Sequence, residues 1–333
     1  MSAVVERPNV LVTSAARKVL LVRAFGEALA RCGSGLVIAA DISPLAAALY
    51  AADMARLIPR SDDLSFVDAL ARICDEDRVG LVVPTRDEEL PILARARDRL
   101  AAAGTTVLVS TAQAVETCRD KARFVAAVRD AGLEAPAVFA DRAAVRYPAF
   151  VKPRLGKGGR GATRVDDPDE LAVALAAIEA AGDEALIQAF EDAPEFTVDV
   201  FIDFEGRPIS CVPRERVAVV GGESVVGRTV RDPALADASI RLCSAIGLVG
   251  HLTVQAFRTE SAVSFIEINP RYGGAANLGF EAGAFTPEYA VRAARGERLE
   301  PHLDDYEVGL VMLRHSADLF VRERDLLRSE ADR

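Results

Sequence analysis

The first part of the chain alternates short apolar runs with longer amphipathic stretches. Runs typical of buried strands occur at NVLVTSA (9–15), GLVIAADIS (35–43), VGLVVPT (79–85) and TTVLVS (105–110). The stretches at 18–33, 65–77 and 87–104 have helical periodicity, and Gly33 is placed to end the first helix. Strands that alternate with helices at this spacing predict a parallel sheet covered on both faces. We therefore expect an N-terminal doubly wound α/β domain over residues 1–115.

The second part of the chain has shorter segments of mixed type. Helical patterns at 120–132 and 168–182 alternate with strand patterns at AFVKP (149–153), ATRVDD (162–167), EALIQAF (184–190) and EFTVDVFID (195–203). The segment DFEGRP is typical of a hairpin turn before ISCVPR, and HLTVQAFRTESAVSFIEINP (251–270) predicts two antiparallel strands around RTESA. Hairpins with flanking helices indicate an α+β region.

Composition and charge narrow the class of protein. A chain of 333 residues that is 50% hydrophobic and 27% charged predicts a globular protein of about two domains. A formal net charge of −10 argues against a nucleic-acid partner, because phosphate neutralisation needs a basic face. No apolar run approaches the roughly 18 residues of a membrane span, and the N-terminus lacks a signal-peptide pattern. We expect a cytoplasmic protein with no membrane partner.

Cysteine and histidine usage bears on the chemistry that the chain can perform. The chain has five cysteines, none spaced as C-x-x-C, and three histidines. This pattern disfavours a zinc site, and no Ser–His–Asp arrangement can be recognised from spacing. If a metal ion is bound, we expect its ligands to be oxygens.

A glycine-rich segment, KPRLGKGGRG (152–161), lies between two predicted strands. Its glycines satisfy G-x-G-x-x-G, but a dinucleotide fingerprint needs a following helix, and the spacing around Lys157 does not match a P-loop. A flexible loop that brings backbone N–H groups, with Lys157 or Arg160, over phosphates fits the pattern. The alternative is a plain surface hairpin with solvated charges.

Two further lysines add weight to the phosphate interpretation of this loop. Period-two alternation places Lys152 on the strand face of Phe150 and Val151 on the opposite face. An inward-facing ammonium is costly unless an anion meets it, so Lys152 indicates an anion site. Lys121 begins the helix after the first domain, where a solvated role is the alternative.

The stretch SFIEINPRYGGAAN (264–277) carries the strongest chemical signal. On a strand, Glu267 and Asn269 project from one face and Ile266 and Ile268 from the other, so both oxygens can hold the same ion or ions. Gln255 lies on the preceding strand and is predicted to face them across the hairpin. Mg²⁺ fits so sparse a set of protein oxygens because it also binds substrate phosphates. Arg271 can stabilise charge on a transferring phosphoryl group.

These residues resemble those of the ATP-grasp superfamily. The likeness rests on Lys121 in DKARF, Lys152 with GKGGRG, Glu195 in APEFTVDV, Gln255 in TVQAF and above all FIEINPRYGG. The chain is most similar to the large-subunit type of carbamoyl-phosphate synthase, including its smaller single-module relatives. NVLVTSAARK and VVPTRDEELPILA are similar to the domain that precedes the grasp. The resemblance implies a two-lobed ATP-grasp domain, with a small lobe at 116–187 and a large lobe at 188–333.

The resemblance also implies roles for individual residues. Glu195 would hold the ribose hydroxyls, and Arg271 would contact the γ-phosphate or an acyl phosphate. Glu267 would bridge two Mg²⁺ ions, for which Mn²⁺ is an alternative, together with Gln255 and Asn269. The residues that would contact the rest of ATP are Lys121, Lys152, the mobile loop with Gly156, Lys157, Gly158, Gly159 and Gly161, and the adenine hinge Gln188, Ala189 and Phe190. The implied reaction activates a carboxylate as an acyl phosphate, which a nucleophile then attacks.

Two departures from the family pattern matter. Ala189 stands where many relatives have an acidic hinge residue, so the preference for ATP over GTP stays open. The first strand–helix turn, TSAARK, is not glycine-rich. We therefore expect the N-terminal domain to support the substrate cleft rather than to hold a nucleotide.

The substrate is indicated only by clustered charge. An acidic chain that concentrates arginine between 214 and 231 suggests a carboxylate or phosphate site, and Arg214 and Arg216 are predicted to share a strand face. A solvated sheet edge is the alternative. Arg214, Arg216, Arg228, Gly273, Gly274 and Asn277 are the candidate substrate residues, and Glu281 is a further candidate near an amine.

Three function classes follow from the sequence. The first is an ADP-producing ligase that joins a small carboxylate, such as an amino acid, to an amine. The second is a phosphotransferase on the same fold that makes no amide, and the third is a non-catalytic nucleotide-binding module. The intact set of Lys152, Glu267, Asn269 and Arg271 disfavours the third. Small-molecule substrates are the expected partners, and a homodimer is compatible with the sequence.

Overall fold

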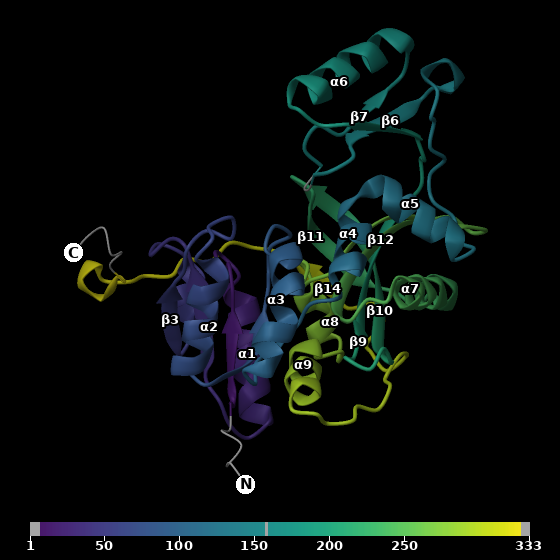
Figure 1. The fold of residues 1–333 in the computed structure, drawn as a ribbon. Helices are drawn as coiled ribbons and strands as arrows, with labels where there is room; N and C mark the ends of the chain where they lie inside the picture. Colours follow the sequence, from purple (N-terminus) through teal and green to yellow (C-terminus); the bar gives the residue numbers. More distant parts are fainter. Residues whose placement is uncertain (1–6, 157–158, 328–333) are drawn as a thin grey trace.

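The computed structural model describes residues 7–156 and 159–327. These residues form sheets of five, three and six strands, and Figure 1 shows the three-stranded sheet standing apart above the other two. The α/β plus α+β class predicted from the sequence is confirmed.

The N-terminal sheet is parallel throughout, with strand order β3-β2-β1-β4-β5. Alternate residues of the central strand, β1, pack into hydrophobic cores on opposite faces of the sheet. Val10 and Val12 pack with Phe25, whereas Leu11 packs with Leu70 and Leu93. Helices therefore cover both faces, as predicted. The elements are β1 (Asn9–Val12), α1 (Val19–Arg31), β2 (Val37–Asp41), η1 (Ala47–Ala51), β3 (Met54–Leu57), α2 (Phe66–Glu76), β4 (Val79–Val83), α3 (Leu90–Ala102) and β5 (Thr106–Val107).

Several elements of this region lie outside the sequence prediction. Strand β3 has the sequence MARL and is half-buried along its length, so it carries neither an apolar run nor a clear alternation. Helix α4 (Ala112–Arg119) begins at Thr111, whose side chain accepts a hydrogen bond from the Ala114 N–H, and it leads directly into α5 (Lys121–Asp130). These elements depend on packing that a short local pattern does not reveal.

The three-stranded sheet has the order β7-β6-β8, with both pairs antiparallel. It consists of β6 (Ala149–Pro153), β7 (Thr163–Val165) and β8 (Ala185–Ala189), and α6 (Pro168–Ala180) covers one face. Val151 is fully buried under α6, and Lys152 points to the other face, as its alternation predicted. A strand, not a helix, follows the glycine-rich segment, which confirms the rejection of a dinucleotide fingerprint.

The six-stranded sheet has the order β13-β12-β9-β10-β11-β14 and is antiparallel. One face packs against α7 through residues such as Val254 and Ile268, and the other lines the cleft described below. The predicted hairpins at DFEGRP and RTESA are confirmed. The elements are β9 (Glu195–Ile202), β10 (Pro208–Val220), β11 (Glu223–Thr229), α7 (Pro233–Ile246), β12 (Gly250–Arg258), β13 (Val263–Asn269), α8 (Asn277–Glu281), α9 (Thr286–Ala294) and β14 (Val311–Leu313), followed by η3 (Glu323–Asp325).

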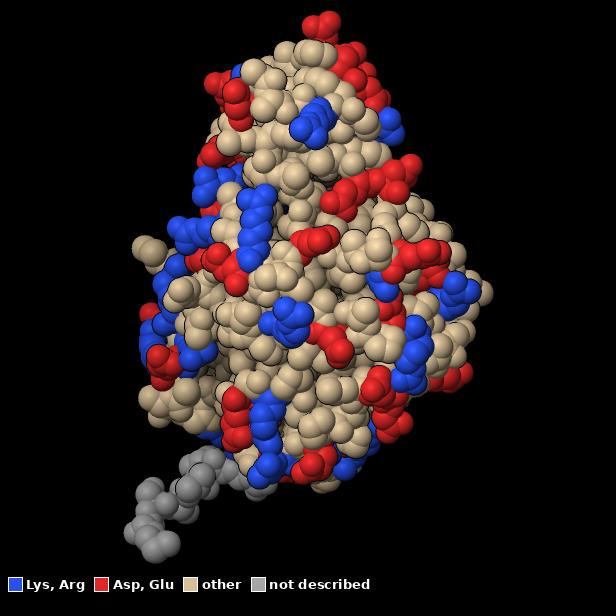
Figure 2. All heavy atoms as spheres, turned by 90° about the vertical axis from the view of Figure 1, so that its right-hand side faces the viewer, with Lys and Arg blue, Asp and Glu red and all other residues tan. Residues whose placement is uncertain are grey.

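The N-terminal sheet and the six-stranded sheet share one hydrophobic core. Phe25 of α1 meets Tyr272 at 5.6 Å between ring centroids, and Ala290 and Val291 of α9 belong to the same cluster. Figure 2 shows one side of the molecule, on which basic and acidic side chains are interspersed. None of the described helices is both long and apolar enough to cross a bilayer.

Candidate active site

The hairpin β12–β13 brings the predicted oxygen ligands together. Gln255 pairs directly with Glu267, and Thr253 pairs with Asn269, so the predicted position of Gln255 across the hairpin is confirmed. The Asn269 Nδ2 group donates to Glu267 Oε1 at 3.0 Å and to Gln255 Oε1 at 3.3 Å. Three side chains therefore converge on one point above the cleft face of the sheet.

The strand that carries Glu267 is not regular. Gln255 and Ala256 are opposite Glu267 and Phe265, so Ile266 is an extra residue, a β-bulge. Phe265 and Ile268 are buried in the core, whereas Ile266 lies beside Glu267 in the cavity lining. The prediction that Ile266 projects from the face opposite Glu267 is wrong, because the bulge turns this side chain to the cleft.

The three oxygen-bearing side chains fit a hard divalent cation. Within residues 7–156 and 159–327, Glu267 makes no ion pair, and no group of three or more His, Cys, Asp and Glu side chains could hold a metal ion. The site thus consists of one carboxylate and two amides. Gln255 already presents Oε1 to the shared point, and Asn269 would have to turn its amide to present Oδ1 to a cation. Mg²⁺ suits such a set, because it keeps positions for water and phosphate oxygens.

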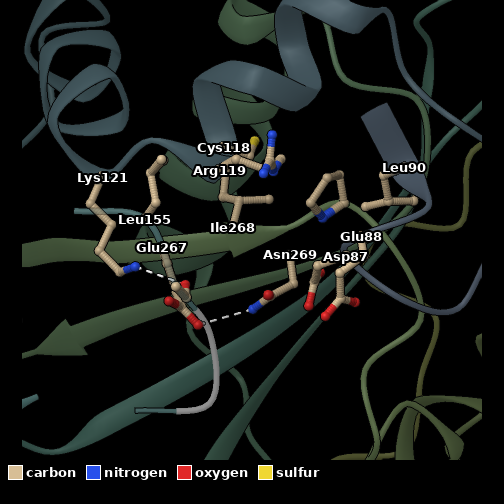
Figure 3. Close-up of a pocket in the computed structure, with 12 residues that line it drawn as sticks. Asp87, Glu88, Leu90, Cys118, Arg119, Lys121, Leu155, Glu267, Ile268 and Asn269 are labelled. Carbon is tan, nitrogen blue, oxygen red and sulfur yellow. Dashed lines mark hydrogen bonds between the residues drawn. The ribbon is translucent and has the colours of Figure 1, made fainter. Parts of the chain in front are cut away.

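Two lysines lie opposite this oxygen cluster. Lys152 of β6 is 6% exposed, and its pKa is lowered to about 8, chiefly by burial and despite the attraction of Glu267. Lys121 at the start of α5 donates to the Gly156 carbonyl at 2.9 Å, and burial lowers its pKa as well. Figure 3 shows Lys121, Glu267 and Asn269 around a cavity of about 210 Å³, which Asp87 also lines. Buried ammonium groups without a carboxylate in direct contact are suited to bind an anion.

The glycine-rich segment connects β6 to β7 at the edge of the cleft. Gly159 and Gly161 have φ values of +67° and +71°, and a Cβ atom at Gly161 would lie 3.1 Å from Pro153 Cγ. Gly156, Gly159 and Arg160 line a cavity of about 310 Å³. Lys157 and Gly158 lie outside the described residues.

This 310 Å³ cavity contains the predicted adenine hinge. Gln188, Ala189 and Phe190 line it beside Phe150 and Phe257. The Ala189 N–H donates to the Ala137 carbonyl at 2.8 Å, and Gln188 Nε2 donates to the Pro136 carbonyl at 3.3 Å. These bonds fix the hinge against the segment before β6.

Glu195 lies at the junction of two cavities. Its Oε1 atom accepts hydrogen bonds from Gln255 Nε2 at 2.7 Å and from Arg216 Nη1. Arg216 and Gln255 line both the 310 Å³ cavity and an adjoining cavity of about 430 Å³. The two cavities are thus parts of one cleft, with Glu267 on the wall that they share.

The 430 Å³ cavity is rich in arginine. Arg214 and Arg216 both line it, as their predicted shared face requires, together with Gly273 and Gly274. Arg214, however, is 2% exposed and makes a bidentate pair with Asp199 at 2.7 and 3.1 Å. Burial alone would raise the pKa of Asp199, but Arg214 and His251 lower it to about 2. The charge of Arg214 is therefore already compensated within the protein, and its role as a substrate cation stays a prediction.

Two other predicted substrate residues lie away from the cavity. Arg228 pairs in register with Glu215, which places it on the face opposite to Arg214 and Arg216, and its Nη2 atom lies 2.5 Å from Glu215 Oε2. Asn277 begins α8 and is not among the lining residues, and Glu281 at the end of that helix is exposed. The strand alternation turns Arg228 outward, so this substrate candidate does not join Arg214 and Arg216 in the lining of the 430 Å³ cavity.

The structure adds two residues that the sequence interpretation missed. Arg314 follows β14, donates to Glu223 at 2.8 Å and to the Gly274 carbonyl, and lines the 430 Å³ cavity. Asp87 follows β4 and binds Arg271 through two 2.7 Å hydrogen bonds. A local signal existed only for Asp87, which comes just after a predicted parallel strand, where ligand sites of such sheets lie.

Comparison with known families supports the two-part architecture. Residues 10–108 match the family described as "PylC-like, N-terminal domain", and residues 182–312 match "ATP-grasp in the biosynthetic pathway with Ter operon". Residues 182–312, which contain Gln255, Glu267 and Asn269, thus match an ATP-grasp family model.

The chain is similar to curated and solved proteins over most of its length. It is 28% identical over 260 residues to the carbamoyl phosphate synthase large chain of Gemmatimonas aurantiaca, a match that covers 72% of this chain and 23% of that protein. The corresponding protein of Rhodopirellula baltica is 29% identical over 230 residues, covering 62% of this chain and 21% of that one. The chain thus spans about a quarter of the length of these relatives.

Solved structures share the ATP-grasp fold. The biotin carboxylase domain of Hydrogenobacter thermophilus 2-oxoglutarate carboxylase has a TM-score of 0.74 and 20% identity, and covers 91% of this chain and 73% of that one. The L-amino acid ligase of Bacillus licheniformis has a TM-score of 0.68 and 20% identity, with 87% and 76% covered. At these identities the likeness concerns the fold alone.

Proposed function

We propose that the chain is an ATP-dependent, ADP-forming carboxylate–amine ligase that works through an acyl phosphate. The observation that carries this proposal is one cleft with two positively charged parts, one with lysines and the other with arginines. Buried Lys152 faces Glu267 in the 310 Å³ cavity, and arginines line the adjoining 430 Å³ cavity. A nucleotide and a small acid would meet at the wall formed by Glu267.

ATP and Mg²⁺ are the proposed co-substrate and cofactor. The Hydrogenobacter thermophilus domain was solved with MgADP and bicarbonate, which supports this assignment by analogy. Lys121, Lys152 and the glycine-rich segment would bind the phosphates, and the hinge at 188–190 would contact the adenine. Gln255, Glu267 and Asn269 would hold Mg²⁺, whose charge would reduce repulsion between the phosphates and an incoming carboxylate. Two ions, and Mn²⁺ in place of Mg²⁺, remain predictions.

The residues of the cleft would align the reacting groups rather than react covalently. A substrate carboxylate oxygen forms a bond to the γ-phosphorus, and the bond to the β,γ-bridging oxygen breaks to release ADP. The amine nitrogen then attacks the acyl carbon, loses a proton, and expels inorganic phosphate. Arg271 and the lysines would stabilise the charge on the transferred group. An acyl phosphate hydrolyses readily, so exclusion of water from the cleft would protect it.

Arg216 and Arg314 would hold the acid in the 430 Å³ cavity. Both guanidinium groups line it, and each already has its own carboxylate partner, Glu195 for Arg216 and Glu223 for Arg314. A guanidinium offers several donors in one plane, so it can bind a substrate carboxylate and keep its internal partner. The identity of the acid and of the amine is not encoded in these contacts.

A phosphotransferase on the same cleft is the second candidate. It is favoured by the curated relatives, which are carbamoyl phosphate synthase large chains. Both candidates need the same nucleotide site, and they differ in whether an amine is consumed.

A screen of ADP release against carboxylates crossed with amines tests the proposal. Release that needs both an acid and an amine, with Mg²⁺ present, supports ligation. Release that needs the acid alone supports phosphotransfer, and no acid-dependent release with any pair contradicts both.

The cellular setting and the assembly state complete the proposal. Small-molecule substrates, a cytoplasmic location and a homodimer remain predictions. The assembly state can be measured by light scattering.

A further inference from the structure

The loop that carries Asp87 is held rigidly at the carboxyl end of the N-terminal sheet. Glu89 is fully buried and accepts hydrogen bonds from the backbone N–H groups of Thr85 at 2.7 Å and Arg86 at 3.0 Å. Its other oxygen accepts from Ser14 Oγ at 3.0 Å. Glu89 therefore ties the loop after β4 to the loop after β1. Asp87 lies within this fixed segment.

Asp87 reaches across to the cleft and binds Arg271. Asp87 Oδ1 accepts from Nε and Oδ2 from Nη2, both at 2.7 Å, although the two residues are 184 positions apart. The side chains are 20% and 19% exposed, so the pair is largely shielded from water. Figure 3 shows Asp87 beside Asn269 at the same cavity. A fork of this kind fixes both the position and the plane of a guanidinium group.

The remaining contacts of Arg271 leave one side of its guanidinium for a ligand. Nη1 donates to the Tyr272 carbonyl at 3.2 Å, and Nη2 lies 3.5 Å from Asn269 Oδ1. Each terminal nitrogen carries two hydrogens: those of Nη2 are directed to Asp87 and Asn269, whereas Nη1 keeps one hydrogen beyond its bond to Tyr272. Arg271 also lines the 430 Å³ cavity. Asp87 thus holds the Nε edge of the group while its other edge faces the proposed acid.

We propose that Asp87 is the positioning residue for Arg271, so that the N-terminal domain sets the geometry of phosphoryl transfer in a cleft built by the other two sheets. This inference rests on the proposed function, because it needs Arg271 to act on the transferred group. An arginine side chain has many rotamers, and most of them would place its charge away from the γ-phosphate. The two hydrogen bonds to Asp87 hold the Arg271 side chain in one rotamer before the substrates bind.

The alternative role for the pair is purely structural, as a link between domains. A structural link predicts that loss of Asp87 lowers thermal stability and leaves the kinetic constants of the folded enzyme unchanged. Positioning predicts a lower kcat with an unchanged KM for ATP. Removal of the Asp87 charge also leaves Arg271 more positive, so the KM for the acid does not rise.

The experiment compares Asp87→Asn, Asp87→Glu and Arg271→Lys in the full chain, using the acid and amine pair found by the screen. Asp87→Asn is nearly isosteric but cannot accept both N–H groups, and we expect kcat to fall about tenfold to a hundredfold. Asp87→Glu restores the charge and recovers part of kcat. Arg271→Lys cannot form the fork, so adding Asp87→Asn to it causes less than a twofold further loss.

Asp232→Asn is the matched control. Asp232 pairs with Arg258 at 2.7 Å, with both side chains 18% exposed, and neither residue lines the cavities at the cleft. Asp232 also caps α7 through the Leu235 N–H, so its loss should lower stability at least as much as loss of Asp87. We expect its kcat to stay within twofold of the wild type.

The outcomes separate the two proposals. If the wild type turns over and Arg271→Lys is strongly impaired, but Asp87→Asn keeps full kcat, the positioning role is wrong and the ligase proposal stands. If the Asp87 and Asp232 variants lose kcat equally, the role of Asp87 is structural. Full activity of Arg271→Lys, or no turnover by the wild type with any pair, overturns the proposed function and the positioning role with it.

Discussion

The two cavities of the cleft carry positive charge in different ways. In the 310 Å³ cavity, Lys152 and Lys121 are buried with lowered pKa values, and within the described residues neither makes an ion pair. In the 430 Å³ cavity, Arg214, Arg216 and Arg271 each have a carboxylate partner, as has Arg314. Because its lysines have no carboxylate partner among the described residues, the 310 Å³ cavity is suited to a ligand with several negative charges. Because its arginines are already paired, the 430 Å³ cavity is suited to select a ligand by shape and hydrogen-bond direction.

The strongest test of this comparison is the residue on the shared wall. Because Glu267 faces both cavities, Glu267→Ala should lower acid-dependent ADP release by at least about a hundredfold at saturating Mg²⁺. Coupled-enzyme detection of ADP measures this. Glu260→Gln, an exposed carboxylate in the turn of the same hairpin, is the control and should retain wild-type turnover. Full turnover of Glu267→Ala would contradict the metal assignment.

The second test asks whether the compensated arginines are structural. Arg214→Ala leaves Asp199 buried without its main partner, so we expect the free energy of unfolding to fall by about 3 kcal/mol or more. Urea denaturation measures the loss. Replacing both members, as in Arg214→Met with Asp199→Leu, should recover part of it. A stable Arg214→Ala protein with a raised KM for the acid would instead restore Arg214 as a substrate residue.

The third test uses pH to distinguish lysine from arginine. The pKa of Lys152 is about 8 in the folded chain and near 10.5 when unfolded, so between these values only the unfolded chain holds the proton. Stability should therefore rise with pH across this window, by up to about 3 kcal/mol, and Lys152→Met should remove the rise. Calorimetry at several pH values measures this slope.

The same titration should affect binding of the nucleotide. Above pH 8 the free enzyme loses the Lys152 charge, so the Kd for ATP should increase there in the wild type. The Lys152→Met protein should bind ATP weakly at every pH. A pH-independent Kd for ATP in the wild type would mean that Lys152 does not contact the phosphates.

The smallest expected effect concerns one arginine that the sequence interpretation missed and one that it named. Arg314→Ala should raise the KM for the acid about tenfold and leave the KM for ATP unchanged, because Arg314 lines only the arginine-rich cavity. Arg228→Ala is the matched control on the opposite face and should change either KM by less than twofold. Steady-state kinetics with each substrate varied in turn separate the two variants.

The sequence predicted those features that depend on local pattern. Period-two alternation correctly turned Lys152 to the cleft, and the hairpin rule placed Gln255 opposite Glu267. Contacts between distant segments were not predictable in this way. The pairing of β14 with β11 brings Arg314 to the cleft, and the partners of Arg214 and Arg271 lie 15 and 184 positions away. A charge run shows that arginines are near one another in sequence, but not which of them are already neutralised.

The bulge at Ile266 has a consequence for transplanting this site. In an uninterrupted strand, Phe265 and Glu267 would project to the same side. The extra residue lets Phe265 fill the core while Glu267 enters the cleft. A designer who grafted FIEIN onto an ideal hairpin would have to give up either the hydrophobic anchor or the carboxylate. A transplanted site therefore needs residues 265–269 together with their irregular pairing to β12.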